Sequence, residues 1–322
     1  MPYVRTPRID VASSELNQAE HDWWKKYSDL IERIWGMPDE LCRRSRGPYL
    51  GRIKAGLREY AKKAGKTGPL EVLEIACGTG WAGRLLSDRD IHVTGVDFSE
   101  EQIEQAKQKA AAEGFENCSY LLQDINGLPE FLAGRSFDAI FIHCGIHHLS
   151  RQELEGFVKT VTTACAPGSL LVLVEPMYHD RRNIFGRALR IAAEVFYRLN
   201  NALFIKHAPV DETVQKRVEE MLGETEAHRW FLSPKEMPFT RREIEDLFRN
   251  AFEVTEVEPV TLYALRMGQQ LSLLRDQGRA RTLGRRWIPL YAALDELLIR
   301  LGLLPIMARD YLFTKIVLSR KS

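Results

Sequence analysis

The spacing of apolar residues divides the chain into a helical N-terminal segment, an alternating central segment and a second helical region toward the C-terminus. Over residues 13–60, aromatic and apolar side chains recur at three- and four-residue steps, which predicts helices with a break at Gly36-Met37-Pro38. After a linker at 64–69, short apolar runs alternate with helix-like segments. We expect strands at 70–76, 91–97, 118–123, 137–143 and 169–175, and helices at 80–87, 99–113 and 151–165.

From residue 180 the pattern changes to long helical stretches. Helices are expected at 184–206, 211–222 and 239–248, strands at 252–260 and 311–319, and a helical insertion at 261–308. The alternation in the central segment predicts an α/β fold, a parallel sheet with helices on both faces. The domains are then an N-terminal helical cap (1–67), an α/β core (68–179), a helical insertion or lid (180–238), and the C-terminal part of the core with its own insertion (239–322).

Composition narrows the functional classes only slightly. The 322 residues carry 45 Lys and Arg against 44 Asp and Glu, a net charge of +1, so no overall positive field argues for nucleic acid. The five cysteines are scattered without a Cys-x-x-Cys pair, which favours reduced thiols in a cytoplasmic protein. The sequence offers neither the roughly 20 consecutive apolar residues of a membrane span nor the apolar run of a signal peptide.

The stretch from Val72 to Gly80 joins an apolar strand to a glycine turn and carries the strongest chemical signal. In an open α/β sheet, ligands bind where the first strand turns into the first helix, and Gly78 and Gly80 allow a close backbone approach there. Read on to Gly83, the turn also matches G-x-G-x-x-G, the pattern of dinucleotide sites. Glu74 opposes a dinucleotide because an acid at this position repels a pyrophosphate, whereas a zwitterionic cofactor with a cationic sulfonium tolerates it.

Two further acids follow at the ends of the next strands. Asp97 lies about 20 residues past the turn, where a carboxylate can accept hydrogen bonds from both ribose hydroxyls. Asp124 follows the third strand, in position to accept from an adenine amino group. Taken singly, either aspartate is as well explained by turn formation. Together with Glu74 they form a set at three consecutive strand ends.

At these residues the chain resembles the class I S-adenosylmethionine-dependent methyltransferases, over roughly residues 68–176. Five segments carry the likeness in order: VLEIACGTG, GVDFSEEQIEQAK, LLQDINGLP, FDAIFIHCGIHHL and APGSLLVLVEP. The resemblance implies a three-layer, Rossmann-like fold with a seven-stranded sheet whose last strand, here 311–319, is antiparallel. It also implies S-adenosyl-L-methionine as the cofactor. One departure is Ala76, where a glycine more often precedes the cysteine, and the added methyl group should narrow the turn slightly.

The resemblance further implies where each part of the cofactor binds. The methionine end falls to Glu74, Ala76, Gly78 and Gly80, the ribose to Asp97, and the adenine to Phe98, Asp124 and Ile125. His143, at the end of the fourth strand, would line the cofactor near the reacting sulfur.

Methyl transfer is an in-line displacement, so the protein's main task is to hold the nucleophile, the methyl carbon and the sulfur collinear. A base is needed only for a weakly acidic nucleophile. For a hydroxyl acceptor we favour His143 and His147 as bases, with His148 and Glu175 as further candidates. A role in shaping the loop is the competing explanation, above all for His148. Gly145 argues against a helix that presents His143 and His147 to one metal ion.

The acceptor must be selected by residues outside the common sheet. We expect a small or medium-sized acceptor methylated at oxygen, either a sugar of a glycan or glycolipid or a polyketide- or quinone-like molecule. The apolar stripes of 184–206 and 285–305, which arginines flank, have three explanations. They pack on the core, they form a lid over a lipophilic acceptor with Tyr178, Trp230 and Phe231 as walls, or they rest peripherally on an anionic membrane.

Two other functional classes also fit the sequence. The literal glycine pattern suggests an NAD(P)-dependent oxidoreductase, whereas a non-catalytic cofactor-binding scaffold would keep the fold without the reaction. Nucleic acid is not expected as a partner, because no basic stripe interleaved with aromatic residues stands out.

Overall fold

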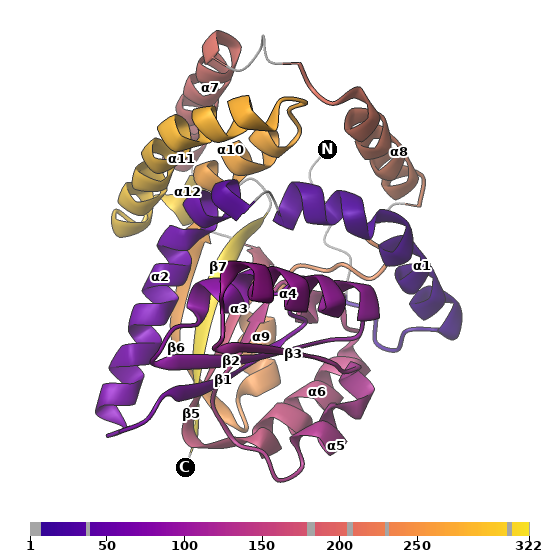
Figure 1. Cartoon of the computed structure of the whole chain (residues 1–322), viewed down its shortest axis with the longest axis vertical. Coiled ribbons are helices and arrows are strands. Elements are labelled where there is room, and N and C mark those ends of the chain that lie inside the picture. Colours follow the sequence, from indigo (N-terminus) through magenta and orange to yellow (C-terminus); the bar gives the residue numbers. More distant parts are fainter. Residues whose placement is uncertain are drawn as a thin grey trace.

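A seven-stranded sheet forms the centre of the protein (Figure 1). The computed structural model describes residues 8–36, 39–178, 184–204, 209–228, 232–307 and 311–321. The strands are β1 (Leu70–Ile75), β2 (Ile91–Asp97), β3 (Cys118–Leu122), β4 (Phe137–His143), β5 (Cys165–Tyr178), β6 (Phe252–Thr261) and β7 (Tyr311–Arg320). Their order across the sheet is β3-β2-β1-β4-β5-β7-β6, and β7 runs antiparallel to both of its neighbours. The expected seven-stranded sheet with an antiparallel last strand is therefore confirmed.

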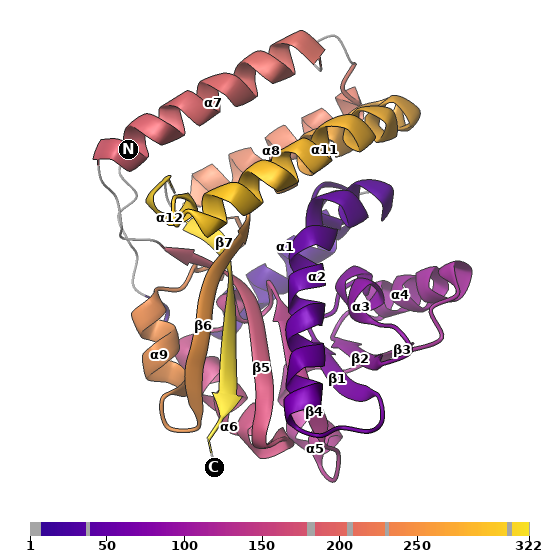
Figure 2. The same ribbon diagram turned by 90° about the vertical axis from the view of Figure 1, so that its left-hand side faces the viewer.

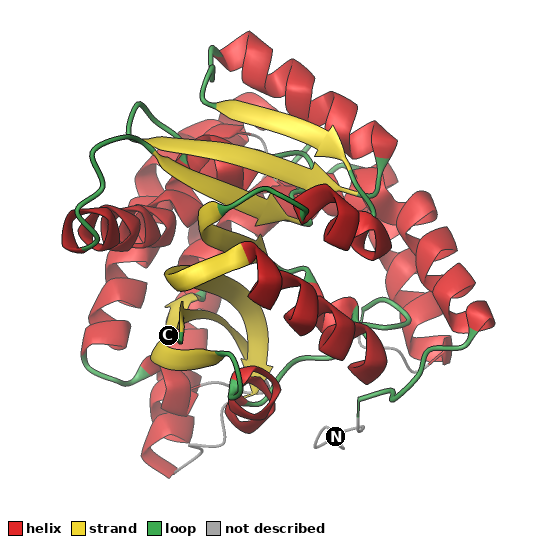
Figure 3. Cartoon of the chain, turned by 90° about the horizontal axis from the view of Figure 1, so that it is seen from below, coloured by secondary structure: helices red, strands yellow, loops and turns green. Residues whose placement is uncertain are grey.

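Helices cover both faces of the sheet (Figure 3). One face carries α5 (Leu128–Leu132), α6 (Arg151–Ala164) and α9 (Arg241–Phe248), and the other carries α2 (Asp39–Lys63), α3 (Trp81–Leu86) and α4 (Glu100–Glu113). Strands β1 and β4 lie near the middle and are covered on both faces, with residues such as Leu73 and Ile140 fully buried. This double coverage explains why both strands read as nearly continuous apolar runs.

The remaining helices form a layer beyond the carboxyl ends of the parallel strands (Figure 2). It consists of α1 (Ser14–Ile31), α7 (Ile184–Phe204), α8 (Glu212–His228), α10 (Tyr263–Ser272), α11 (Gln277–Arg300) and α12 (Leu304–Met307). Apolar contacts hold α1 against α8 around Trp23 and Tyr27, and they hold α10, α11 and α12 together around Tyr263 and Tyr291. Ligands bind at the carboxyl edge of such sheets, so this layer covers the expected site.

Two element boundaries differ by four residues or more from those expected. Strand β5 begins at Cys165 rather than at residue 169, because Cys165 pairs with Phe137 of β4 and the ladder resumes after a register shift. Helix α8 continues through Gly223 to His228, beyond the expected end at residue 222. Burial of Met221 and Thr225 along the helix explains why packing overrides the low helix propensity of glycine there.

Candidate active site

The turn after β1 follows a left-handed backbone path that glycine makes possible. Gly78 and Gly80 have φ angles of +54° and +69°. The Tyr120 hydroxyl on β3 donates to the Gly80 carbonyl oxygen at 2.9 Å, and a Cβ built on Gly80 would lie 2.4 Å from the Tyr120 ring. The turn therefore has room only for glycine at this position. Ala76, where the chain departs from glycine, also has a positive φ of +57°.

The carboxyl group of Glu74 lies beneath this turn. Glu74 is buried, and a Cβ built on Gly83 would lie 2.5 Å from its Oε2, so the third glycine lets α3 pass directly over the acid. Oε2 finds no hydrogen-bond partner among the described residues. Burial raises the pKa of Glu74 to about 8, against the opposing charge of Arg84. The pattern G-x-G-x-x-G is thus explained by packing over an acid, and Glu74 supports the turn from below.

Asp97 connects the end of β2 to the glycine turn. Its Oδ2 accepts a hydrogen bond from the Gly78 amide at 2.9 Å, and its Oδ1 accepts from the Ser99 amide at 3.0 Å. Burial raises the pKa of Asp97, and hydrogen bonds from the Ser99, Gly78 and Phe98 amides oppose that shift. Each carboxylate oxygen has a second lone pair, so Asp97 can still accept from ribose hydroxyls. The adjacent Phe98 is 51% exposed, so its ring is accessible to a ligand.

The two residues expected at the adenine, Asp124 and Ile125, differ in their burial. Asp124 is exposed, whereas Ile125 begins a short 3-10 turn (Ile125–Gly127) and packs against the main core. Asp124 is therefore open to solvent, whereas Ile125 is partly buried.

The N-terminal cap reaches the glycine turn through Glu32, which no local sequence pattern marks. Glu32, in the π-helical turn η1 (Glu32–Gly36), accepts a hydrogen bond from the Thr79 hydroxyl at 2.9 Å. The same Oε1 atom accepts from Lys109 of α4 at 2.7 Å. Farther along α1, the His21 ring lies 6.5 Å from the Phe98 ring, centroid to centroid. The cap therefore lies against the glycine turn and the end of β2.

His143 occupies an aromatic environment next to the turn. Its Nε2 lies 2.9 Å from the Tyr49 hydroxyl of α2, and its ring meets the edge of Trp81, the first residue of α3, at 4.8 Å between centroids. The Arg46 guanidinium lies over the Trp81 ring, 4.0 Å from its centroid. Burial lowers the pKa of His143 well below its usual value, and the Arg46 charge adds to the shift. His143 is therefore neutral at pH 7.

His147 pairs with Glu175 at the ends of adjacent strands. It lies in the 3-10 turn η3 (Ile146–His148), and its Nδ1 is 2.6 Å from Glu175 Oε2. The other oxygen of Glu175 accepts from the backbone amides of Gly145 and Ile146 at 2.9 and 3.0 Å. Burial raises the pKa of Glu175 to about 7 and lowers the pKa of His147. Because burial disfavours both charges, the pair readily shares one proton.

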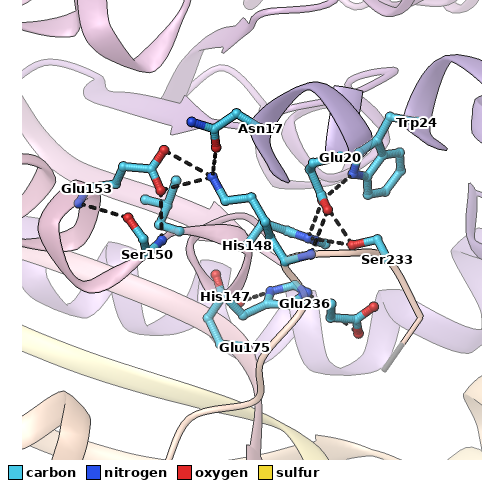
Figure 4. A network of polar contacts seen from close by, with 12 residues as sticks. Asn17, Glu20, Trp24, His147, His148, Ser150, Glu153, Glu175, Ser233 and Glu236 are labelled. Carbon is cyan, nitrogen blue, oxygen red and sulfur yellow. Dashed lines mark hydrogen bonds and ion pairs between the residues drawn. The ribbon is translucent and has the colours of Figure 1, made fainter. Parts of the chain in front are cut away.

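His148 faces α1 instead of the sheet (Figure 4). Its Nδ1 lies 3.0 Å from Glu20 Oε1 and 3.2 Å from the Ser233 hydroxyl, and the Trp24 indole donates to the same glutamate. Hydrogen bonding to Glu20 raises the pKa of His148 against the effect of burial, and the pKa of Glu20 falls to about 2. His148 thus serves as an ion-pair partner that holds α1 in place, which agrees with the structural explanation for it.

Glu236 completes this cluster from the segment between α8 and α9. Its Oε1 lies 3.8 Å from His147 Nε2, and burial raises the pKa of Glu236 to about 7. The neighbouring Lys235 donates to Asn17 of α1 and to both carboxylate oxygens of Glu153 on α6. No local pattern marks Glu20 or Glu236, because only tertiary packing brings them to the histidines.

The candidate bases therefore divide into two groups. His143 faces Tyr49 and Trp81 on the cofactor side, whereas His147 faces Glu175 and Glu236. Within the described ranges, no group of three or more His, Cys, Asp or Glu residues is arranged to hold a metal ion. The expected acceptor walls Trp230 and Phe231 lie outside the described residues.

Comparisons with known proteins agree with this architecture. A family model for a methyltransferase domain matches residues 72–168, the segment that holds the glycine turn, Asp97 and both candidate bases. Sterol 24-C-methyltransferase erg-4 of Neurospora crassa is 27% identical over 204 residues, which are 61% of this chain and 52% of that protein. Sterol 24-C-methyltransferase erg6 of Aspergillus fumigatus is 28% identical over 182 residues, 54% of this chain and 47% of that protein. The chain spans about half the length of these curated relatives.

Among solved structures, the (4+2)-cyclase SpnF superimposes with a TM-score of 0.51 over 98% of this chain and 99% of that chain. At 16% identity, this likeness shows the fold alone. The five sequence segments, the strand order and the matched domain model agree with one another. The chain therefore carries a methyltransferase domain of the S-adenosylmethionine-dependent kind over residues 72–168, and its cofactor is S-adenosyl-L-methionine.

Proposed function

We propose that the chain is an enzyme that transfers a methyl group from S-adenosyl-L-methionine to an oxygen of a small or medium-sized acceptor. A sugar of a glycan or glycolipid and a polyketide- or quinone-like molecule are the acceptor classes we favour. One observation carries the proposal: the His147–Glu175 pair lies at the ends of β4 and β5, on the same sheet edge as the glycine turn after β1. The five free cysteines agree with the reducing cytoplasm that we propose as its location.

The residues at the glycine turn fit the cofactor. Gly78 and Gly80 would hold the methionine end through the backbone, Asp97 would accept from the ribose hydroxyls, and the exposed Phe98 ring would cover the adenine. When bound, S-adenosylmethionine supplies an electrophilic methyl group on a good leaving group. A neutral His143 beside the turn avoids the repulsion that an imidazolium would exert on a sulfonium.

His147 is the base that we propose for the acceptor hydroxyl. With Nδ1–H donating to Glu175, its Nε2 keeps a lone pair and can accept a proton. The carboxyl group of Glu236 lies 3.8 Å from Nε2 of His147. An acceptor hydroxyl that reaches Nε2 would therefore bind next to Glu236. Glu175 is a positioning residue, since it sets the tautomer and orientation of the imidazole.

Carbon is the second candidate for the acceptor atom. The curated relatives are named sterol 24-C-methyltransferases, which favours a lipophilic acceptor methylated at carbon. Addition of a methyl group to an alkene carbon leaves a cation that must lose a proton, so His147 would serve as base here too. Identification of the methylated product decides between the two atoms.

Calorimetric titration tests the cofactor assignment. The protein should bind S-adenosylmethionine and its demethylated product but not NAD, and binding of NAD alone would refute the proposal. Asp97→Ala should weaken S-adenosylmethionine binding about tenfold or more, because a buried acceptor for the ribose hydroxyls is lost. Asp246→Ala, at an exposed acid on α9, should bind as the unmodified protein does. Unchanged affinity in Asp97→Ala contradicts the ribose assignment.

A labelled-methyl assay then tests catalysis. Extract fractions are incubated with the protein and methyl-labelled S-adenosylmethionine, and the label is followed into organic and aqueous phases. If the unmodified protein incorporates labelled methyl groups and Asp97→Ala does not, the result supports the proposed methyltransferase activity. Tight cofactor binding without incorporation into any fraction would instead favour a non-catalytic scaffold.

A further inference from the structure

Helix α7 is the outermost element of the layer above the sheet, as Figure 2 shows. One side of it is tightly packed. A Cβ built on Gly186 would lie 2.2 Å from the Ile306 carbonyl oxygen, so α7 rests directly on α12. Toward the other end of the helix, the Tyr197 hydroxyl donates to Gln270 of α10 at 2.9 Å, and its ring contacts Tyr291 of α11. These contacts fix which side of α7 faces away from the protein.

The opposite side of α7 presents large apolar side chains to the exterior. Six of them are more than half exposed: Ile184 (85%), Phe185 (61%), Ile191 (59%), Val195 (51%), Phe196 (52%) and Leu199 (58%). At 3.6 residues per turn, these six fall within a sector of about 140°, and the exposed Ala188 and Ala192 fill the gaps between them. A continuous apolar face of this kind on a water-facing surface indicates a binding surface.

Arginines border this apolar face. Arg187, Arg190 and Arg198 lie on the polar side of α7, and only one acid, Glu194, lies among them. Glu194 pairs with Arg198 and with Arg266 of α10, whereas Arg187 and Arg190 pair with no acid among the described residues. The sequence adds Arg181 and Arg182 just before the helix and Lys206 just after it. The surface therefore combines apolar bulk with positive charge.

We propose that α7 lies in the interface of an anionic lipid membrane, with its apolar face among the acyl chains and its arginines at the phosphates. An amphipathic helix with bulky apolar residues on one side and arginines at the border has the composition of interfacial helices. A second copy of the chain would bring further arginines to the same border, whereas lipid phosphates supply the opposite charge. No helix in the described part of the chain is long and apolar enough to cross a membrane.

Helix α11 contributes less to such a surface. Leu290, Leu297 and Leu301 are exposed at its face and end, but Ile288, Tyr291 and Leu298 are buried against neighbouring helices. Membrane contact was expected through both 184–206 and 285–305. Because most of the apolar side of α11 is covered, we assign the proposed contact to α7 alone. Because α7 follows β5, which carries Glu175, the proposed membrane surface is close in sequence to the residue that positions the proposed base.

Vesicle flotation of the full chain tests the proposal. The protein should float with phosphatidylcholine vesicles that contain phosphatidylglycerol, float much less with pure phosphatidylcholine, and be released in part by high salt. Phe185→Ser/Phe196→Ser should lower binding to the anionic vesicles about tenfold or more, since two large apolar side chains no longer enter the membrane. The matched control is Leu222→Ser/Val11→Ser, which removes two exposed apolar side chains outside α7 and α11 and should float as the unmodified protein does.

Three results would overturn the proposal. The first is no flotation with either vesicle, and the second is flotation that the phenylalanine variant leaves unchanged. The third is a stable dimer, measured by light scattering, that the phenylalanine variant converts to monomers while vesicles are not bound, since a second copy then covers α7. The variant should bind S-adenosylmethionine normally, so this test stands apart from that of the proposed reaction.

Discussion

His147 and Glu175 form a hydrogen-bonded pair, with Nδ1 of the histidine 2.6 Å from Oε2 of the glutamate. Both side chains are buried, and the second glutamate oxygen is held by the amides of Gly145 and Ile146. The carboxylate therefore cannot rotate without breaking two bonds to the backbone. This arrangement favours the tautomer with a proton on Nδ1, which leaves Nε2 as the acceptor.

Glu175→Gln should lower kcat about tenfold to a hundredfold while the affinity for S-adenosylmethionine stays the same. The glutamine oxygen can still accept from the two amides, but its NH₂ group then faces Nδ1 and moves the histidine proton to Nε2. Steady-state kinetics with the identified acceptor, together with calorimetry, measure both quantities. Glu245→Gln, at an exposed position on α9, is the control. An unchanged kcat would show that the His147–Glu175 pair only maintains the structure of the loop after β4.

The buried Glu74 should make unfolding stability depend on pH. Its folded-state pKa is raised from 4.5 to about 8, so its stabilising contribution is complete below the lower value and is lost as pH rises toward the upper one. The loss approaches about 1.4 kcal/mol per pH unit within this window. Glu74→Gln cannot ionise and should lose less stability between pH 5.5 and pH 7.5, within that window.

Urea denaturation across that range measures the difference between the two proteins. Glu116→Gln, at an exposed glutamate just before β3, should follow the unmodified protein. Curves for Glu74→Gln and the unmodified protein that run parallel at every pH would show that Glu74 does not titrate in the folded state as its burial indicates.

The fold follows from local patterns where the sequence signal is itself local. Strands β2 and β4 begin and end where the apolar runs do, because each is a buried parallel strand bounded by turn residues. The start of β5 was wrong by four residues, since pairing between Cys165 and Phe137 depends on a register shift that no local pattern reveals. Likewise, α8 passes through Gly223 because tertiary packing overrides propensity.

The candidate site could be predicted only where its residues follow strand ends. Asp97, His143 and Glu175 end strands or lie near the strand's end, so their common edge follows from the topology of a parallel sheet. Glu20 and Glu236 lie on α1 and on the segment before α9, and only packing of the helical layer brings them to the histidines. The side chain of Glu74 lies beneath the glycine turn because side chains alternate between the two faces along β1. A motif match gives the residue but not the face of the sheet on which its side chain lies.

Ala76→Gly should stabilise the protein by about 0.5–1 kcal/mol. Ala76 has a φ of +57°, where an L-residue with a Cβ is strained and glycine is not. Chemical denaturation at pH 7 measures the change. Ala293→Gly, at an exposed position within α11, should instead lose about 1 kcal/mol, because glycine is unfavourable in a helix. A loss of stability in Ala76→Gly would mean that contacts of its methyl group outweigh the strain.

Arg8→Met should lower both stability and kcat, because Arg8 ties the N-terminal segment to the loop that carries His147. Its guanidinium donates to the carbonyl oxygens of Leu149 at 3.1 Å and Met237 at 2.8 Å, and it stacks on the Phe239 ring at 4.1 Å. Methionine fills similar space but leaves the carbonyls without a donor, which should cost about 1–3 kcal/mol of unfolding free energy.

The kinetic consequence separates a positioning role for Arg8 from a purely structural one. If Arg8 holds the loop in its active geometry, kcat falls while KM changes little, and Arg8→Lys recovers part of the loss because one donor is restored. Arg151→Met, at a mostly exposed arginine at the start of α6, is the matched control and should leave both quantities unchanged. Reduced stability with an unchanged kcat would show that Arg8 braces the fold without affecting His147.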